Sequence, residues 1–309
     1  MGEVAGQIPE NSRELLAAIL KEATGEALQF AEQIRGIGMN NSVSVVRCRQ
    51  GRFVIRTNVE SHLFRYEREA WCYQQLAGTP VLTPEVLRCG VLKGHSFSVA
   101  RFIEGSEPIG LGLDHNRIWR VLGSYGRYLN QVNPPSAPEE LARLFPQGWA
   151  AQVEADVSII FRGSLWLDRG FLTPEQQGVV RGYLEGCASG SAPLGICQFD
   201  MTVANAVICN GDYQKIYLLD LESANIAPVP YYQLACIAAD KGPSSEPARA
   251  FFEGYGPGAD QDPAELRRFL LYRVMRATAW ARDRYPALLD ENLERTRPVL
   301  AQALSSLGT

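Results

Sequence analysis

The spacing of hydrophobic residues changes several times along this chain of 309 residues. Apolar residues recur every three or four positions in RELLAAILKEA (13–23), which predicts a helix that Asn11 or Ser12 would cap. A second helix is expected in GEALQFAEQI (25–34). The pattern then shifts to two short β-rich runs in SVSVVRCRQGRFVIRT (42–57), which predict two strands joined by a turn at RQGR.

Helical spacing returns in ESHLFRYEREAWCYQQLAG (60–78), where Gly78 would end the helix. The segment TPEVLRCGVLKGHSFSVARFI (83–103) favours a second hairpin that turns at Lys93 and Gly94. Residues 36–103 are therefore expected to form a small sheet with one helix packed on it.

Beyond Gly105 the pattern is mainly helical, with one β-rich insert at 194–224 that turns at Asn210-Gly211-Asp212. Thr173, followed by Pro174, is a start signal for one of the helices. The chain is thus expected to be α+β and bilobal, divided into residues 1–103 and 104–309. The three expected helices of this part are in 116–132, 173–188 and 262–284.

Composition and charge narrow the class of protein. Hydrophobic residues make up 46% and charged residues 21%, as in ordinary globular proteins. The net charge of −4 gives no overall basic field for nucleic acid. The seven cysteines show no CxxC spacing and most lie among apolar residues, so we expect reduced thiols in the core. The three histidines form no metal-binding pattern.

Targeting signals are not found in the sequence. The N-terminus lacks a basic start followed by an apolar core, and Gly6 stands where a myristoylation signal needs Ser or Thr. No apolar run approaches the roughly 20 residues of a membrane span. We therefore expect a cytoplasmic protein with no membrane and no nucleic-acid partner.

Three polar residues interrupt apolar strand-like segments. Asp200 and Asn205 occur in QFDMTVANAVIC (198–209), and Asp220 occurs in YLLDLESA (217–224). Burying such groups costs several kcal/mol unless they are paired. Strands joined by one tight turn can bring these oxygens together, and oxygen ligands suit Mg²⁺ when phosphates complete its shell. The alternative is local, with Asp200 capping a turn and Asn205 bonding nearby backbone.

The order of these motifs resembles a known family. Asp200-x4-Asn205 followed by LLDLE (218–222) is similar to the catalytic loop and metal aspartate of protein kinases, and more so to those of the aminoglycoside phosphotransferase (choline-kinase-like) group. The resemblance covers roughly residues 30–300. It implies a protein-kinase-like fold, with a small N-terminal β-sheet lobe that carries an αC helix and a larger, mainly helical C-terminal lobe.

The resemblance also implies roles. Asp200 would accept or orient the proton of a substrate hydroxyl, while Asn205 and Asp220 hold Mg²⁺ at the phosphates of ATP (or GTP). The other matching segments are the glycine-containing loop at 36–42, the strand RFVIRTN, the αC glutamate and the hinge SVARFIEG. The nucleotide-binding residues implied by these segments are Gly38, Asn41, Ser42, Arg56, Glu69, Arg101 and Ile103.

Three residues depart from the family pattern. Arg56 stands where lysine is usual, and arginine presents a planar fork in place of a point charge. Gln198 replaces a histidine, and Gln233 replaces an aspartate that braces the catalytic loop. We hypothesise that the two glutamines brace the loop through amide hydrogen bonds. The departures also motivate an alternative function, a nucleotide-binding pseudokinase that regulates a partner.

The substrate is expected to be a small molecule with a hydroxyl group. Aromatic residues Trp149, Phe161 and Trp166, with Glu222, line the pocket in one interpretation, whereas the aromatics belong to the core in the other. A protein substrate is disfavoured because no APE motif follows Asp220. The segment 265–297 has eight arginines against five acids, so we favour a neutral or anionic metabolite over an aminoglycoside, unless most arginines face solvent.

Overall fold

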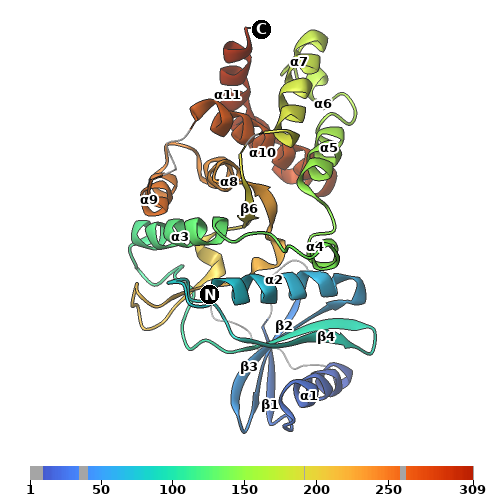
Figure 1. Ribbon diagram of the computed structural model, residues 1–309, viewed down its shortest axis with the longest axis vertical. Coiled ribbons are helices and arrows are strands. Elements are labelled where there is room, and N and C mark those ends of the chain that lie inside the picture. Colours follow the sequence, from blue (N-terminus) through green and yellow to red (C-terminus); the bar gives the residue numbers. More distant parts are fainter. Residues whose placement is uncertain (1–9, 35–40, 191, 258–261, 309) are drawn as a thin grey trace. The chain divides into compact units, whose positions relative to one another are not determined.

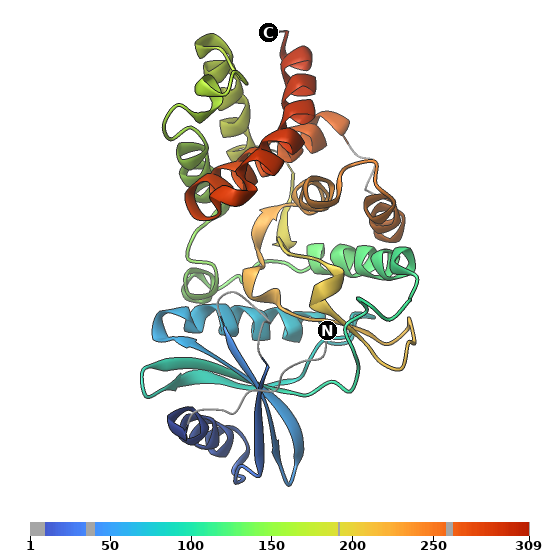
Figure 2. The ribbon, with the colours of Figure 1, turned by 180° about the vertical axis from the view of Figure 1, so that it is seen from behind.

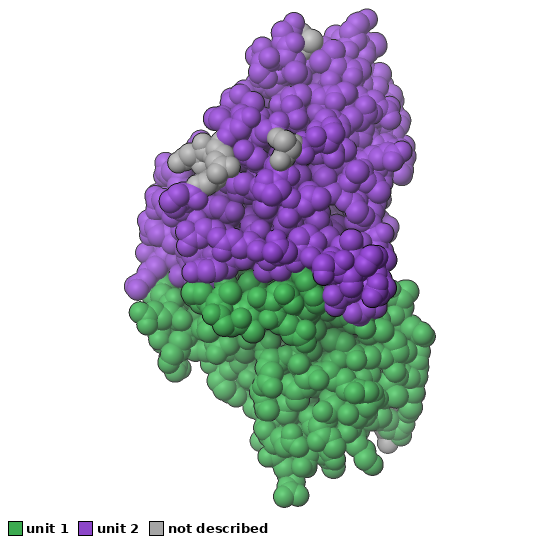
Figure 3. Space-filling model, in the orientation of Figure 1, with its two compact units in different colours: residues 1–113, 202–224 green, residues 114–201, 225–309 purple. Residues whose placement is uncertain are grey.

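The computed structural model describes residues 10–34, 41–190, 192–257 and 262–308 (Figure 1). The chain divides into two compact units, which Figure 3 distinguishes by colour. The first contains residues 1–113 and 202–224, and the second contains residues 114–201 and 225–309. The segment 202–224 thus folds with the N-terminal part of the chain.

The first unit is built on an antiparallel sheet with the strand order β1-β2-β3-β5-β4 in the described residues. This sheet and the helical second unit match the predicted α+β, kinase-like architecture. The elements of the first unit are α1 (Glu10–Thr24), β1 (Phe30–Ile34), β2 (Ser42–Cys48), β3 (Gly51–Val59), η1 (Glu60–His62), α2 (Leu63–Leu76), β4 (Val86–Leu92), β5 (His95–Arg101), η3 (Val203–Asn205), β7 (Ala206–Ile208), β8 (Ile216–Leu218) and η4 (Leu221–Ser223).

Both predicted hairpins of this unit are confirmed. β2 and β3 join at the expected turn, and β4 and β5 join through Lys93 and Gly94, whose φ angles are 50° and 77°. Two successive positive φ angles match the right-handed twist of the strands they connect. Gly78, with φ of 83°, follows the end of α2 as expected.

Two predictions near the N-terminus are wrong. The expected helix at 25–34 is instead strand β1, which pairs with β2 from Phe30↔Arg47 to Ile34↔Val43. Pairing with an available sheet edge here outweighs local helical spacing. The expected cap is also misplaced, because α1 begins at Glu10 and includes both Asn11 and Ser12.

Helix α1 covers one face of the sheet (Figures 1 and 2). Its Ile19 and Leu20 pack with Val46, Phe53 and Ile55 of β2 and β3. Since successive strand residues point to opposite faces, the same strands turn their intervening residues away from α1. This alternation determines which side chains reach the candidate site.

The segment 202–224 adds a short hairpin to the first unit. β7 pairs with β8, and the predicted turn is confirmed by positive φ at Asn210 and Gly211. The hairpin attaches through bridges of Tyr217 to Leu82 and of Ile208 to Ser106. These backbone contacts fix the strand that leads into Asp220.

The second unit is mainly helical, with β6 and β9 forming an antiparallel pair. All three predicted helices are confirmed, and Thr173 forms the full capping box of α7. The elements are α3 (His115–Asn130), α4 (Pro138–Leu144), α5 (Trp149–Ile160), α6 (Leu165–Asp168), α7 (Pro174–Glu185), η2 (Gly186–Ala188), β6 (Leu194–Cys197), β9 (Asn225–Pro228), α8 (Tyr231–Lys241), α9 (Glu246–Tyr255), α10 (Pro263–Arg284), η5 (Pro286–Leu288) and α11 (Leu289–Leu307).

Aromatic residues form much of the core of this unit. Trp149, Phe161 and Trp166 are all buried in it, which confirms the core interpretation over a ligand platform. The indole N–H groups of Trp149 and Trp166 donate to the carbonyl oxygens of Cys187 and Ile160, so the buried polar atoms are satisfied.

All seven cysteines lie in the described part of the chain and are free thiols. Five are buried, and burial raises the pKa of Cys187 and Cys236 to about 12. Such thiols stay protonated and behave as small apolar side chains. No helix in the described residues combines the length and apolar character needed to cross a membrane.

Candidate active site

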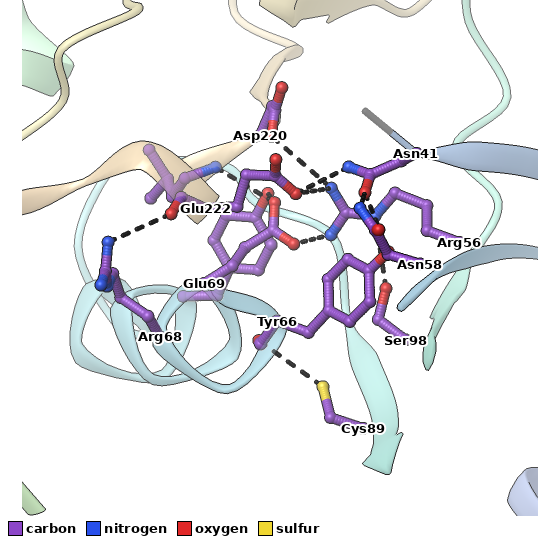
Figure 4. A network of polar contacts seen from close by, with 12 residues as sticks. Asn41, Arg56, Asn58, Tyr66, Arg68, Glu69, Cys89, Ser98, Asp220 and Glu222 are labelled. Atoms are coloured by element: carbon purple, nitrogen blue, oxygen red, sulfur yellow. Dashed lines mark hydrogen bonds and ion pairs between the residues drawn. The ribbon is translucent and has the colours of Figure 1, made fainter. Parts of the chain in front are cut away.

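Arg56 lies at the centre of a charged cluster in the first unit (Figure 4). It is placed on β3 directly opposite Ser98 of β5, on the sheet face turned away from α1. Its Nε donates to Ser98 Oγ at 3.3 Å, and its guanidinium lies 5.2 Å from the ring centre of Tyr66. The strand register therefore fixes the stem of this arginine and leaves the outer guanidinium nitrogens for other partners.

Three carboxylates surround those outer nitrogens (Figure 4). Nη2 forms an ion pair with Glu69, while Nη1 lies 3.6 Å from Asp220 Oδ1 and 3.9 Å from Glu222 Oε2. The Glu69 side chain is 1% exposed, whereas that of Asp220 is 40% exposed. The buried acid thus anchors the arginine, and the exposed acid is accessible to a ligand.

Helix α2 holds the segment around Asp220 through two consecutive residues. Glu69 Oε1 accepts from the N–H of Leu221 at 3.1 Å and from the hydroxyl of Tyr73 at 2.7 Å. Arg68 Nη1 donates to the carbonyls of Glu222 at 3.3 Å and Ala224 at 2.9 Å. Burial lowers the pKa of Arg68 to about 10, which still leaves it charged at neutral pH.

Asp220 itself adopts an uncommon backbone conformation. Its φ and ψ are 59° and 57°, in the left-handed region, immediately before the 3-10 turn η4. A non-glycine residue pays for this conformation, and such residues concentrate at functional sites. The N–H of Leu219 donates to the carbonyl of Asn205 at 2.8 Å, so the backbones at both predicted metal ligands belong to one held segment.

This donor set fits magnesium with a phosphorylated ligand. Mg²⁺ prefers hard oxygen atoms and keeps several sites for water and phosphate, so one or two protein ligands are enough. The partly exposed Asp220 carboxylate meets that need. In the described residues, no group of three or more His, Cys, Asp or Glu side chains is placed to hold a metal ion.

Both the oxygen and the nitrogen of the Asn41 side-chain amide form hydrogen bonds within the first unit (Figure 4). Its Oδ1 accepts from Asn58 Nδ2 at 2.7 Å and from the Tyr66 hydroxyl at 3.1 Å. Its Nδ2 donates to Glu222 Oε2 at 2.8 Å. Burial raises the pKa of Tyr66, so this hydroxyl remains a donor. Glu222, which is expected along a substrate pocket, contacts Asn41 and Arg56.

The remaining predicted nucleotide residues lie at two other places. Ser42 Oγ accepts from Gln33 Nε2 at 3.0 Å on the neighbouring strand. Arg101 ends β5, with its N–H donating to the Glu85 carbonyl at 2.9 Å and its Nε 2.5 Å from Glu85 Oε2. In the described part of the chain, the N–H of Ile103 has no hydrogen-bond partner. Gly38 lies outside the described residues.

Asp200 belongs to the second unit, in an exposed turn that follows β6. Two residues earlier, the backbone of Gln198 is fully buried and is held by the side chain of Gln233 from α8. Gln233 Oε1 accepts from the Gln198 N–H at 2.9 Å, and Gln233 Nε2 donates to the Gln198 carbonyl at 3.0 Å. The predicted amide brace is confirmed for Gln233, which acts on the backbone of Gln198.

The arginines of 265–297 are largely neutralised. Six of the eight form ion pairs with acids, so their excess does not by itself create an anion-binding surface. The pairs are Arg268–Glu265, Arg273–Asp240, Arg276–Asp156, Arg282–Asp283, Arg295–Glu291 and Arg297–Glu294.

Sequence reasoning missed three residues of the charged cluster: Asn58, Tyr66 and Ser98. Strand alternation could have found Asn58, because it lies two residues beyond Arg56 and faces the same side of β3. Ser98 could have been found only with the β3–β5 register. Tyr66 lies three residues before Glu69 on α2, a spacing that puts both on neighbouring positions of one helix face.

Comparisons by sequence find no relative: no family model and no curated protein matches the chain. Comparisons by structure do. The GDP and kanamycin complex of APH(2'')-IIIa matches 93% of this chain and 99% of its own, with a TM-score of 0.64 and 14% identity. The chain has the aminoglycoside phosphotransferase fold. This confirms, at the level of the fold, the resemblance expected from the sequence motifs.

Two other aminoglycoside phosphotransferase folds match nearly the whole chain. A ternary complex of a thermostable APH(4)-Ia mutant with AMP-PNP and hygromycin B covers 93% of this chain and 97% of its own, with a TM-score of 0.63 and 14% identity. Spectinomycin phosphotransferase APH(9)-Ia with ADP and spectinomycin covers 96% and 98%, with a TM-score of 0.54 and 15% identity. All three structures contain a nucleotide and a small molecule.

Proposed function

We propose that this protein is a phosphotransferase that moves the γ-phosphate of ATP or GTP to a hydroxyl group of a small molecule, with Mg²⁺ as cofactor. The observation that carries the proposal is the cluster of Arg56, Glu69 and Asp220 at the first unit's sheet. It combines a phosphate-binding cation, its buried anchor and a partly exposed oxygen ligand. The nucleotides in the similar structures support the same assignment.

Each residue has a distinct part in this reaction. Arg56 binds phosphate oxygens while Glu69 fixes its orientation, and a guanidinium offers two parallel donors for that task. Asn205 and Asp220 hold the magnesium ion, which when bound neutralises charge on the phosphates. Asp200 accepts or orients the proton of the substrate hydroxyl. The contribution of the protein is mainly positioning and charge stabilisation.

The nucleotide base would be held at the end of β5. The N–H of Arg101 is committed to Glu85, so the available groups are the N–H of Ile103 and neighbouring carbonyls. The edge of a purine base can form hydrogen bonds with one backbone N–H donor and one backbone carbonyl acceptor. Residues 1–103 would supply the nucleotide-binding lobe, and residues 104–309 the catalytic and substrate-binding lobe.

The acceptor would be an antibiotic or another hydroxylated metabolite. The proteins with the similar folds are crystallised with kanamycin, hygromycin B and spectinomycin. In this chain six of the eight arginines of 265–297 are paired with acids, and the segment has no acidic excess to attract a polycation. We therefore favour a neutral or anionic hydroxylated metabolite.

A second candidate function is favoured by Arg56 itself. Here an arginine replaces the usual lysine and already contacts Asp220 at 3.6 Å, so the metal-binding acid has a cation beside it. A protein of this kind could bind nucleotide and regulate a partner without turnover.

Nucleotide consumption separates the two candidates. Wild type and Asp200→Asn would be incubated with ATP or GTP and a panel of sugars, alcohols and antibiotics, and nucleoside diphosphate release would be measured. The proposal predicts that at least one compound stimulates release, that its product carries phosphate, and that Asp200→Asn lowers the rate by roughly 10²-fold or more. Nucleotide binding without any Asp200-dependent turnover would favour the regulator.

A further inference from the structure

Asn41 and Glu222 form a partly buried hydrogen bond that joins residues 181 positions apart in the sequence. Asn41 precedes β2, and Glu222 is the second residue of η4. Glu222 is 9% exposed, so its carboxylate depends on the partners it has in the protein. Those partners are Asn41 Nδ2 at 2.8 Å and Arg56 Nη1 at 3.9 Å.

The link leads directly to the acid of the candidate metal site. The same Arg56 nitrogen that lies 3.9 Å from Glu222 also lies 3.6 Å from Asp220. Arg56 is therefore shared by both carboxylates, and a change of charge at Asp220 changes the total electrostatic interaction of this cation. Glu222 and Asp220 also share one short turn, whose backbone is held by Glu69 and Arg68.

On the other side, Asn41 is rigidly placed. Its Oδ1 accepts from Asn58 of β3 and from Tyr66 of α2, and this orientation of the amide directs one N–H of Nδ2 to Glu222. The three hydrogen bonds of this amide are all made with protein groups. The resemblance implies that Asn41 binds nucleotide, and the contacts of its side chain in the structure are with protein groups.

We propose that the Asn41–Glu222 hydrogen bond couples nucleotide binding to magnesium binding, with Asn41 as a positioning residue. The hydrogen bond connects the start of β2 to the turn that carries Asp220. Nucleotide bound near the start of β2 would therefore favour magnesium bound at Asp220, and the reverse. This inference rests on the proposed function of the same cluster. Coupling of this kind is reciprocal: magnesium raises nucleotide affinity by the factor by which nucleotide raises magnesium affinity.

The test uses an exchange of polarity. In Asn41→Asp, two carboxylates face each other where a 2.8 Å hydrogen bond stood, so the link is lost and repulsion replaces it. In the double variant Asn41→Asp with Glu222→Gln, the new glutamine donates to the new aspartate. That aspartate can still accept from Asn58 and Tyr66, and the total charge of the pair is unchanged.

The readout is the ratio of the dissociation constants for ADP and for AMP-PNP without and with Mg²⁺, from calorimetry. We expect a ratio of about 10 or more in wild type, a ratio within about threefold of one in Asn41→Asp, and a return to within about threefold of wild type in the double variant. Asn210→Asp, which adds a charge at an exposed turn of the same unit, should leave the ratio unchanged.

A purely structural role would change thermal stability without changing this ratio, so melting temperatures are measured in parallel. If Asn41→Asp does not fold, Asn41→Ala removes the bond without repulsion and should lose the coupling as well. A wild-type ratio in a folded Asn41 variant would overturn the inference, and so would a double variant that folds without recovering the ratio. If wild type binds no nucleotide, the proposed function and the inference both fail. If wild type binds nucleotide and only the Asn41 variants behave otherwise than expected, the inference alone fails.

Discussion

At the scale of single residues, buried polar groups in this protein act in pairs. Glu69 is 1% exposed; it forms an ion pair with Arg56, and its Oε1 accepts from the Tyr73 hydroxyl and the Leu221 N–H. Gln233 is fully buried and makes two reciprocal hydrogen bonds to the backbone of Gln198. A buried polar group without a hydrogen bond destabilises the folded state by more than one hydrogen bond stabilises it. Removing either partner of such a pair is therefore expected to destabilise the protein.

Replacing Gln233 by Met should therefore destabilise the second unit. Methionine fills a similar volume but can neither accept from the Gln198 N–H nor donate to its carbonyl. Each buried group that loses its partner costs about 1–3 kcal/mol, so we expect a loss of about 2–4 kcal/mol in urea denaturation. Gln302→Met, at an exposed site of the same unit, serves as control. A loss below 0.5 kcal/mol, on the order of ordinary surface substitutions, would contradict the bracing role.

Much of this chemistry could be predicted from single residues, and part of it could not. Asp220 and Glu69 were placed by motif spacing, and in the structure both lie beside Arg56. The hydrogen bond from Asn41 to Glu222 joins residues 181 positions apart, and no local pattern encodes it. The role of a side chain that depends on a partner far away in the sequence can be assigned only once the fold is known.

At the scale of elements, glycines decide how closely two helices of the second unit approach. Gly123 on α3 and Gly254 on α9 each face the backbone of the other helix. A Cβ at Gly254 would overlap the backbone oxygen of Arg120, and a Cβ at Gly123 would overlap that of Phe251. A backbone oxygen cannot rotate away as a side chain can, so this contact admits only glycine.

Gly254→Ala should destabilise the protein although alanine favours helices. We expect a loss of about 1–3 kcal/mol from forced separation of α3 and α9. Gly182→Ala on α7 is the matched control, because an added Cβ there meets nothing within 4 Å. That control should gain about 0.5–1 kcal/mol, and thermal denaturation of both variants compares the signs. A stabilised Gly254→Ala variant would refute the close contact.

Elements with a clear local signal were predictable from sequence. Helix α7 begins where Thr173 and Pro174 indicate, and the β4–β5 turn falls at Lys93 and Gly94. Strand β1 was not predictable, because its residues show helical spacing and become a strand only by pairing with β2. Tertiary pairing is a long-range property that periodicity does not contain.

At the scale of the whole molecule, chain order and spatial order differ. Residues 202–224 follow the first helices of the second unit in sequence, yet they pack with the first unit through bridges to Leu82 and Ser106. This return brings Asp220 and Glu222 to Arg56. The sequence indicated two lobes and the order of the motifs. It did not indicate that this hairpin belongs to the first unit, because that depends on backbone contacts between residues far apart in the chain.

The central claim is that the cluster around Arg56 and Asp220 binds a magnesium nucleotide. Calorimetric titration of wild type, Asp220→Ala and the control Asp212→Ala with ATP and GTP, in Mg²⁺ and in EDTA, tests it most directly. We expect Mg²⁺ to tighten nucleotide binding by about tenfold or more in wild type and in the control, and Asp220→Ala to lose this dependence. Undiminished Mg²⁺ dependence in Asp220→Ala, or no nucleotide binding by wild type, would contradict it.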